Sequence, residues 1–302
     1  MNSVQRPALS GLLLASAGAI ALSGKAIIVK LSYLYGIDAV TVIMYRMLFA
    51  LPFFIAMGLW AERQAIAREN PLTRRDVIDI VGLGFVGYYL SSYLDFLGLQ
   101  YITASLERLI LYLNPTLVML LGWVLYKKPI RPIRILAMGV SYCGVLLVFA
   151  HELTLSGANV ALGGGLILAS AISYAVYLLY SGELVQRIGS LRLVGWATSV
   201  ACVCCIAQFV VLRPLSAADV PVDVLWLGVL NALACTVAPV LMVMMAIERI
   251  GAALTAQTGM IGPMSTIALG VLLLDEPLNI WIGVGTLLVV SGVFIVSKYG
   301  AK

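Results

Sequence analysis

The chain has 302 residues, of which 62% are hydrophobic and only 11% are charged. This composition excludes a water-soluble globular protein, because too few polar side chains remain to cover its surface. The formal net charge of +5 at pH 7 would suggest a nucleic-acid partner for a soluble domain. Here we assign the basic residues to the loops of a membrane protein and expect no nucleic-acid partner.

Long apolar segments recur along the whole chain, most of them close to the length that crosses a hydrocarbon layer of about 30 Å as a helix. Backbone groups that face lipid must be hydrogen-bonded internally, so these segments are expected to be helical. The sequence therefore predicts an all-α integral membrane protein with ten transmembrane helices, at 9–34, 38–60, 76–100, 104–125, 133–150, 162–182, 191–212, 222–247, 252–274 and 278–298.

The second half of the chain repeats the first. An ungapped shift of 148 residues aligns several identical pairs, namely Ile102 with Ile250, Leu106 with Leu254, Pro115 with Pro263, Gly122 with Gly270 and Pro129 with Pro277. A shift of 154 residues aligns 11–17 with 165–171, so the first apolar segment has an internal counterpart and is a span rather than a cleaved signal peptide. We expect two units, 1–152 and 153–302, each with five spans.

Most of the 19 Lys and Arg residues fall at the N-terminus, at the C-terminus or in loops on one side of this topology. The positive-inside rule then places both termini in the cytoplasm and the protein in the cytoplasmic (inner) membrane. An odd number of spans in each unit inverts the second unit relative to the first. The change from Lys127-Lys128 to Asp275-Glu276 at equivalent loops agrees with that inversion. Inverted repeats are typical of transporters with a site near the middle of the membrane.

Ionisable residues within the spans of the first half are the main candidates for a substrate pathway, because unpaired charge at such depth is costly. They are Lys25, Lys30, Arg46, Asp95, Glu107 and Arg108. Four cations and two anions favour a substrate that carries a carboxylate or another anionic group. We expect Lys25 to pair with Asp95 and Arg46 with Glu107, whereas the neighbours Glu107 and Arg108 point apart and Lys30 reaches the membrane surface. A purely structural ion network is the alternative.

The second half offers aromatic and amide side chains instead. Tyr174, Tyr177 and Tyr180 are spaced to share one helical face, and Gln257 lies in a later span. They belong to the expected substrate pathway, with a packing stripe as the alternative. Pro115, Pro239 and Pro263 lie inside predicted spans, where each permits a kink and is a candidate for gating, or is an ordinary tolerated proline.

Three other sequence features are interpreted as structural rather than as binding or catalytic sites. The run from Gly82 to Gly87 fits GxGxxG but lies in an apolar span without a preceding strand, so close helix packing explains its glycines better than a dinucleotide. The five cysteines all lie in apolar runs and are interpreted as small core residues, with a soft-metal role for Cys202, Cys204 and Cys205 as the alternative. The single histidine, His151, excludes a histidine triad or cluster. We expect no metal, no cofactor and no catalytic residue.

The chain resembles the drug/metabolite transporter superfamily, in particular its ten-helix EamA-type branch. The resemblance rests on 101–144, on its copy up to Gly292, and on the first-span ending Ile27-Ile28-Val29-Lys30. Arg46 matches an arginine that the family often has in its second span. Leu22-Ser23-Gly24-Lys25 stands where the family typically has Trp-Gly-Ser-Asn, and Glu107 and Arg108 replace small residues. The resemblance implies export of small metabolites without ATP hydrolysis.

The expected function is a secondary transporter, acting as an exporter of an amino-acid-like or organic-anion substrate by alternating access. Proton coupling through Asp95 or Glu107, exchange, and the substrate's own gradient all remain open as energy sources. A structural membrane scaffold or an intramembrane enzyme without transport activity is the alternative. The expected partners are a small-molecule substrate and the lipid bilayer, with a homodimer as an open possibility.

Overall fold

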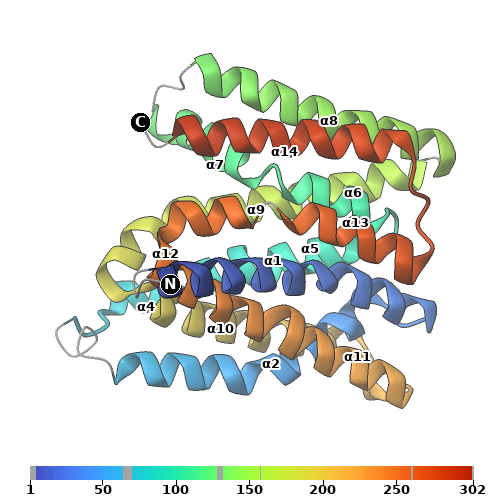
Figure 1. The fold of residues 1–302 in the computed structure, drawn as a ribbon. Coiled ribbons are helices and arrows are strands. Elements are labelled where there is room, and N and C mark those ends of the chain that lie inside the picture. The colour runs from blue at the N-terminus through green and yellow to red at the C-terminus, as the bar shows by residue number, and fades with distance from the viewer. Residues whose placement is uncertain (1–4, 64–69, 128–131, 157, 260, 301–302) are drawn as a thin grey trace.

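The computed structural model describes residues 5–63, 70–127, 132–156, 158–259 and 261–300. Within these ranges the fold is all-helical and holds no β-strand. The long helices lie roughly along one common direction (Figure 1). The helices of the first half are α1 (Gln5–Leu34), α2 (Ala39–Glu62), α4 (Arg74–Leu83), the π-helix η1 (Gly84–Leu90), α5 (Ser91–Gly98), α6 (Ala104–Leu111), α7 (Asn114–Tyr126) and α8 (Pro132–Ser156).

The second half contains the remaining helices. They are α9 (Ala158–Ile188), α10 (Ser190–Leu212), the short 3₁₀ helix η2 (Leu215–Ala218), α11 (Val222–Ala232), the π-helix η3 (Leu233–Val237), α12 (Ala238–Thr258), α13 (Ile261–Leu274) and α14 (Ile280–Gly300).

Eight helical stretches of the described residues are long and apolar enough to cross a membrane, and they end within a few residues of the first eight predicted spans. Two shorter apolar helices, Ile261–Leu274 and Ile280–Ile295, fall within the last two predicted spans. One boundary was wrong: the sequence predicts a loop at 248–251, but α12 continues to Thr258. The interruption falls instead at Gly259, just before Pro263, whose ring nitrogen cannot donate to the preceding turn.

Side-chain caps fix where several helices begin. The carboxylate of Asp38 accepts hydrogen bonds from the backbone N–H groups of Val40 and Thr41 at the start of α2. Thr73 and Asp76 form a reciprocal capping box at the start of α4, and the Thr103 hydroxyl accepts from the N–H of Leu106 at the start of α6. These bonds satisfy donors that have no partner within the helix.

The helix α1 occupies the middle of the bundle and packs against α11, α12 and α13. Apolar residues from both halves form the core around it, including Ile27, Ile43, Phe96, Leu109 and Ile167, all of which are almost fully buried. The helices α8 and α14 pack on each other at one edge, and α2 lies at the opposite edge against α10 and α11 (Figure 1).

Ion pairs join α2 and α10 at both of their ends. Near the end of α2, Glu62 accepts two hydrogen bonds from Arg192, at 2.7 Å from Nε and 2.5 Å from Nη2. Before its start, Asp38 lies 3.3 Å from Nη2 of Arg213. Burial alone would raise the pKa of Asp38, but hydrogen bonds from Arg213 and Thr41 outweigh it and hold that pKa below its ordinary value. The two helices are therefore antiparallel.

The same backbone irregularities recur 148 residues apart. The π-helix η1 (Gly84–Leu90) has its counterpart in η3 (Leu233–Val237). The break between α6 and α7 corresponds to the break between α12 and α13. Lys127 and Asp275, separated by the same shift, both have a left-handed φ of 52°. π-helical turns are rare and concentrate at functional sites, so these segments mark where each half departs from a simple helical span.

Two glycines of the GxGxxG run lie where helices touch. A Cβ on Gly84 would lie 2.4 Å from the carbonyl oxygen of Ala197, and one on Gly87 would lie 2.4 Å from Cβ of Tyr177. Gly82 faces open space, with nothing within 4 Å of its ideal Cβ. Close packing thus explains Gly84 and Gly87, as the sequence predicts, but not Gly82.

We predict that Gly84→Ala lowers the free energy of unfolding by about 1–3 kcal/mol, because the added methyl meets the rigid backbone of α10. Gly82→Ala is the matched control and should leave it unchanged or raise it by up to about 1 kcal/mol, because alanine favours the helix more than glycine does. Thermal unfolding of both variants in detergent measures the difference. Equal stabilities would contradict this account of the packing.

Candidate functional site

A buried ammonium shared by two carboxylates lies between three helices of the first half. Nζ of Lys25, on α1, is paired with Asp95 on α5 and lies 3.2 Å from Oε1 of Glu107 on α6. Glu107 is fully buried, and Lys25 and Asp95 are nearly so. The structure brings these three predicted residues together and confirms the Lys25–Asp95 pair.

The guanidinium of Arg108 connects this cluster to the second half. Its Nε donates to the hydroxyl of Thr266 at 3.0 Å, and its Nη2 donates to the carbonyl oxygen of Leu22 at 3.0 Å. The same Nε lies 4.0 Å from Oε2 of Glu107. The expectation that the neighbours Glu107 and Arg108 do not pair was therefore wrong, because both long side chains bend toward each other from adjacent positions.

Arg46 has a different set of partners from the one expected. Its Nε donates to the hydroxyl of Thr236 on η3 at 2.9 Å, and its Cζ lies 5.2 Å from the ring centroid of Phe96. The expected Arg46–Glu107 pair was wrong, because Glu107 faces Lys25 and Arg108. Nη1 of Arg46 is buried and has no hydrogen-bond partner among the residues that the structure describes.

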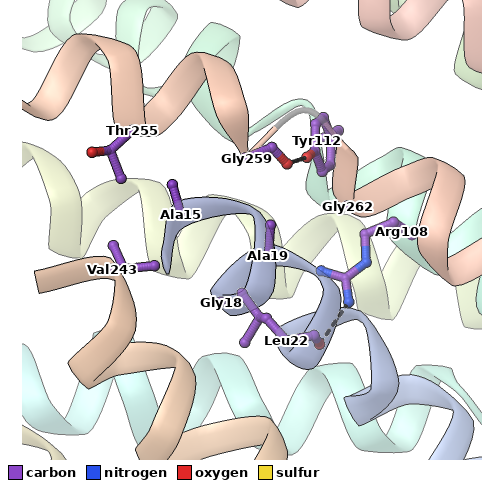
Figure 2. A pocket seen from close by; sticks show the side chains of 10 residues that line it. All are labelled: Ala15, Gly18, Ala19, Leu22, Arg108, Tyr112, Val243, Thr255, Gly259 and Gly262. Atoms are coloured by element: carbon purple, nitrogen blue, oxygen red, sulfur yellow. Dashed lines mark hydrogen bonds between the residues drawn. The ribbon is translucent and has the colours of Figure 1, made fainter. Parts of the chain in front are cut away.

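A cavity of about 280 Å³ lies beside Arg108, between the two halves of the chain. Its walls come from α1, α6, α12, α13 and the breaks that follow α6 and α12. Figure 2 shows the Arg108 guanidinium beside Leu22 at one side of the cavity and Ala15 and Val243 at the other. The lining residues are Ala15, Gly18, Ala19, Leu22, Arg108, Tyr112, Val243, Thr255, Gly259 and Gly262.

The broken helices meet at this cavity. The hydroxyl of Tyr112, in the break after α6, donates to the carbonyl oxygen of Gly259, in the break after α12 (Figure 2). Ser23 of α1 donates to the carbonyl oxygen of Gly262 at 2.9 Å. Backbone carbonyls on both sides of the break after α12 are thereby hydrogen-bonded to side chains of the first half.

The three predicted tyrosines do not all lie on one face of α9. Tyr174 and Tyr177 stack on each other and contact Tyr88 of η1, with the Tyr88 and Tyr177 hydroxyls 3.3 Å apart. Tyr180 is half-exposed beside Tyr126 and lines a second cavity, of about 770 Å³, between α4 and α9. Residues three apart drift by about 60° around a helix of 3.6 residues per turn, so the third tyrosine leaves the shared face.

Two of the three prolines lie in the first turn of a helical segment that follows a break: Pro115 begins α7, and Pro263 is the third residue of α13. At these two positions an interruption replaces the expected kink, which fits proline because the first turn needs no N–H donor there. Pro239 follows η3 directly and lies inside one continuous helical span, Val222–Ala246, as the sequence predicts. The side chain of Gln257 lies outside the described residues.

The EamA-like transporter family matches this sequence twice, over residues 9–150 and over residues 161–298. The chain belongs to the EamA-like transporter family. It is 29% identical over 304 residues to the "uncharacterized transporter YcbK" of Bacillus subtilis (strain 168), covering 96% of this chain and 92% of that protein. Family membership and these names indicate a membrane transporter rather than an enzyme.

Other relatives of this EamA-like chain are more distant. The "uncharacterized transporter YyaM" of the same bacterium is 24% identical over 238 residues, covering 76% of this chain and 78% of that one. The "uncharacterized transporter sll1319" of Synechocystis sp. is 23% identical over 241 residues, with 78% and 73% covered. A solved crystal structure, 16% identical with a TM-score of 0.61 and covering 97% of this chain and 98% of its own, shares the fold.

Sequence reasoning missed several residues that complete the site in this EamA-like protein. Glu276, in the connection between α13 and α14, accepts hydrogen bonds from the N–H groups of Ala104 and Ser105 at 2.7 and 3.3 Å. Its carboxylate also accepts from the Ser105 hydroxyl at 2.8 Å. The cap joins residues far apart in the sequence, so no local motif could have revealed it. Thr236 and Thr266, which hold the two arginines, likewise lie on distant helices.

We predict that Lys25→Met lowers the free energy of unfolding by about 3–5 kcal/mol, because Asp95 and Glu107 would then face each other without a shared cation. Adding Asp95→Asn to Lys25→Met should recover most of that loss, since Glu107 then keeps Arg108 as its cation. Thermal unfolding in detergent tests both variants. Wild-type stability of the Lys25→Met single variant would show that the ammonium does not hold the cluster.

Proposed function

We propose that this protein is a secondary transporter that exports a small amino-acid-like or organic-anion metabolite across the cytoplasmic membrane by alternating access. The observation that carries the proposal is the cavity of about 280 Å³ between the halves, with the buried cation of Arg108 in its wall. A charged side chain buried among apolar helices indicates a substrate pathway unless counter-charges fully compensate it. Residues of both halves line the cavity beside Arg108, as expected for a transport site between repeats. Export is the direction that the family resemblance implies.

Two features support a ten-span arrangement of inverted halves. The π-helices, the helix breaks and the left-handed residues Lys127 and Asp275 recur at one sequence shift. The helices α2 and α10, which are the second long helix of each half, are antiparallel, as their paired ends show. Basic residues such as Arg63, Arg74 and Arg75 follow α2, and by the positive-inside rule they support a cytoplasmic position for that side and for both termini.

Arg46 fits as a second cation of the pathway. It is anchored through Nε to Thr236, but its buried Nη1 has no hydrogen-bond partner within the described part of the chain. Leaving a buried charged donor unsatisfied is costly, so an anion that reaches Nη1 when the halves move would be stabilised there. The proposed pathway also has an aromatic part, formed by the rings that contact one another between η1 and α9. These are Tyr88, Tyr174 and Tyr177.

Arg46→Gln and Arg108→Gln are each expected to abolish flux while the protein still folds, because each removes a cation that compensates the anionic substrate. The measurement is counterflow in proteoliposomes with a panel of radiolabelled amino acids and organic anions. Arg63→Gln, on an exposed residue at the end of α2, is the matched control and should keep wild-type flux. Near-normal counterflow in both buried variants would remove the assigned roles.

We further infer that Glu107 carries a proton during transport. The charged groups that face it are Lys25 from α1, Asp95 from α5 and Arg108 on its own helix. Lys25 is shared with Asp95, so Glu107 is compensated only in part, by Lys25 at 3.2 Å and by Arg108 at 4.0 Å. An anion bound at Arg108 would compete with Glu107 for the guanidinium charge and thereby favour the protonated carboxyl. The anion and the proton would then bind together.

Glu107→Gln is expected to eliminate substrate-coupled proton movement but to retain exchange of labelled for unlabelled substrate, since the amide mimics the protonated carboxyl. A pH-sensitive dye inside proteoliposomes follows the protons, and the isotope follows the substrate. Asp95→Asn serves as the comparison, because Asp95 stays bound to Lys25. Coupled proton movement that persists in Glu107→Gln would exclude this residue as the carrier.

A further inference from the structure

The cavity beside Arg108 has two chemically distinct sides. The guanidinium lies beside Leu22 at one side, whereas Ala15, Ala19 and Val243 give the rest of the wall an apolar character (Figure 2). Its volume of about 280 Å³ is just below the range of about 300–1,000 Å³ for ordinary ligand pockets. The site therefore suits a small molecule with one anionic end and a short apolar end.

The cation in the wall is held in place but retains donors for a ligand. Thr266 and the carbonyl oxygen of Leu22 take one hydrogen bond each from Arg108. The planar guanidinium has further N–H groups, which match the two oxygens of a carboxylate. Because the side chain is already fixed, little conformational entropy is lost when a carboxylate binds.

An ammonium group would find no counter-charge here. No Asp or Glu is among the described residues that line the cavity. The carbonyl oxygens of Leu22, Gly259 and Gly262 already accept hydrogen bonds from Arg108, Tyr112 and Ser23. The Arg108 charge would also repel a second cation, so a zwitterion would leave its ammonium desolvated and unpaired.

Small residues of α1 create the space for the apolar end. Ala15 and Ala19 line the cavity, and a Cβ on Gly18 would lie 3.3 Å from Cβ of Met242, so α12 can approach closely there. A larger side chain at position 19 would project into the cavity. Ala17 is exposed on another face of the same helix and does not line the cavity.

We propose that this cavity binds a small aliphatic monocarboxylate without an ammonium group, of the size and shape of a branched-chain oxo acid. The proposal rests on the proposed transport function and chooses between its two substrate classes. The carboxylate would bind Arg108 and the branched tail would lie against Ala15, Ala19 and Val243.

Matched ligand pairs test this proposal on the purified full-length protein in detergent. Ketoisocaproate and leucine share a tail and a carboxylate and differ in the ammonium group, as do ketoisovalerate and valine. The oxo acids are expected to raise the melting temperature, and the amino acids to bind more than about tenfold more weakly, because an unpaired buried ammonium is costly. Equal or greater stabilisation by the amino acids, or none by the oxo acids, would overturn the proposal.

Variants locate the binding. Ala19→Leu should weaken ketoisocaproate binding by about tenfold or more by filling the cavity, whereas Ala17→Leu should leave it unchanged. Arg108→Lys should retain part of the affinity and Arg108→Gln should lose it. Ala19→Leu keeps every charge, so it gives an answer even where Arg108→Gln does not fold. Undiminished binding in Ala19→Leu would place the ligand elsewhere.

The flux panel separates this inference from the proposed function. Amino-acid flux without oxo-acid stabilisation would refute the choice of monocarboxylate but support a transporter. The absence of counterflow with every compound, together with oxo-acid stabilisation that Ala19→Leu abolishes, would support the binding site but refute transport.

Discussion

One buried ammonium, that of Lys25, determines how three helices of the first half can meet. Two carboxylates share it inside an apolar bundle, where an ion without a partner is costly. The helices α1, α5 and α6 must therefore adopt the one register that brings Lys25, Asp95 and Glu107 together. Arg108 follows Glu107 directly in the sequence, so the same register also places its guanidinium between α1 and α13 and into the wall of the cavity.

Interrupted helices are the second requirement of this site. Continuous helices would keep their carbonyl groups bonded internally and would present only side chains to one another. The breaks after α6 and α12 instead bring backbone carbonyls and the Tyr112 hydroxyl to the contact between the halves. The π-helices place a comparable irregularity in each half, and η3 supplies Thr236, which holds Arg46. Several polar contacts between the halves are thus made where the helices are irregular.

Hydropathy and internal repetition predicted much of the fold, because span length and loop charge are local properties of the sequence. The Lys25–Asp95 pair was also predictable, since few buried anions lie at the depth of Lys25. The partner of Arg46 was not, because the choice between Glu107 and Thr236 depends on how α2 and η3 are rotated. The separation of Tyr180 from Tyr174 and Tyr177, in contrast, follows from the drift of residues three apart around a helix, which their spacing alone predicts. Helix rotation is set by packing between distant segments, and a single sequence does not record it.

The carboxylate of Glu276 has a consequence for the movement of the halves. It belongs to the second half but satisfies two backbone N–H groups and one hydroxyl at the start of α6 in the first half. If that end of the bundle opens, these donors and the carboxylate must all find new partners, and water is the available one. Separation of Glu276 from the start of α6 therefore requires that water enters the space between them. The closed arrangement can form again only when that water leaves.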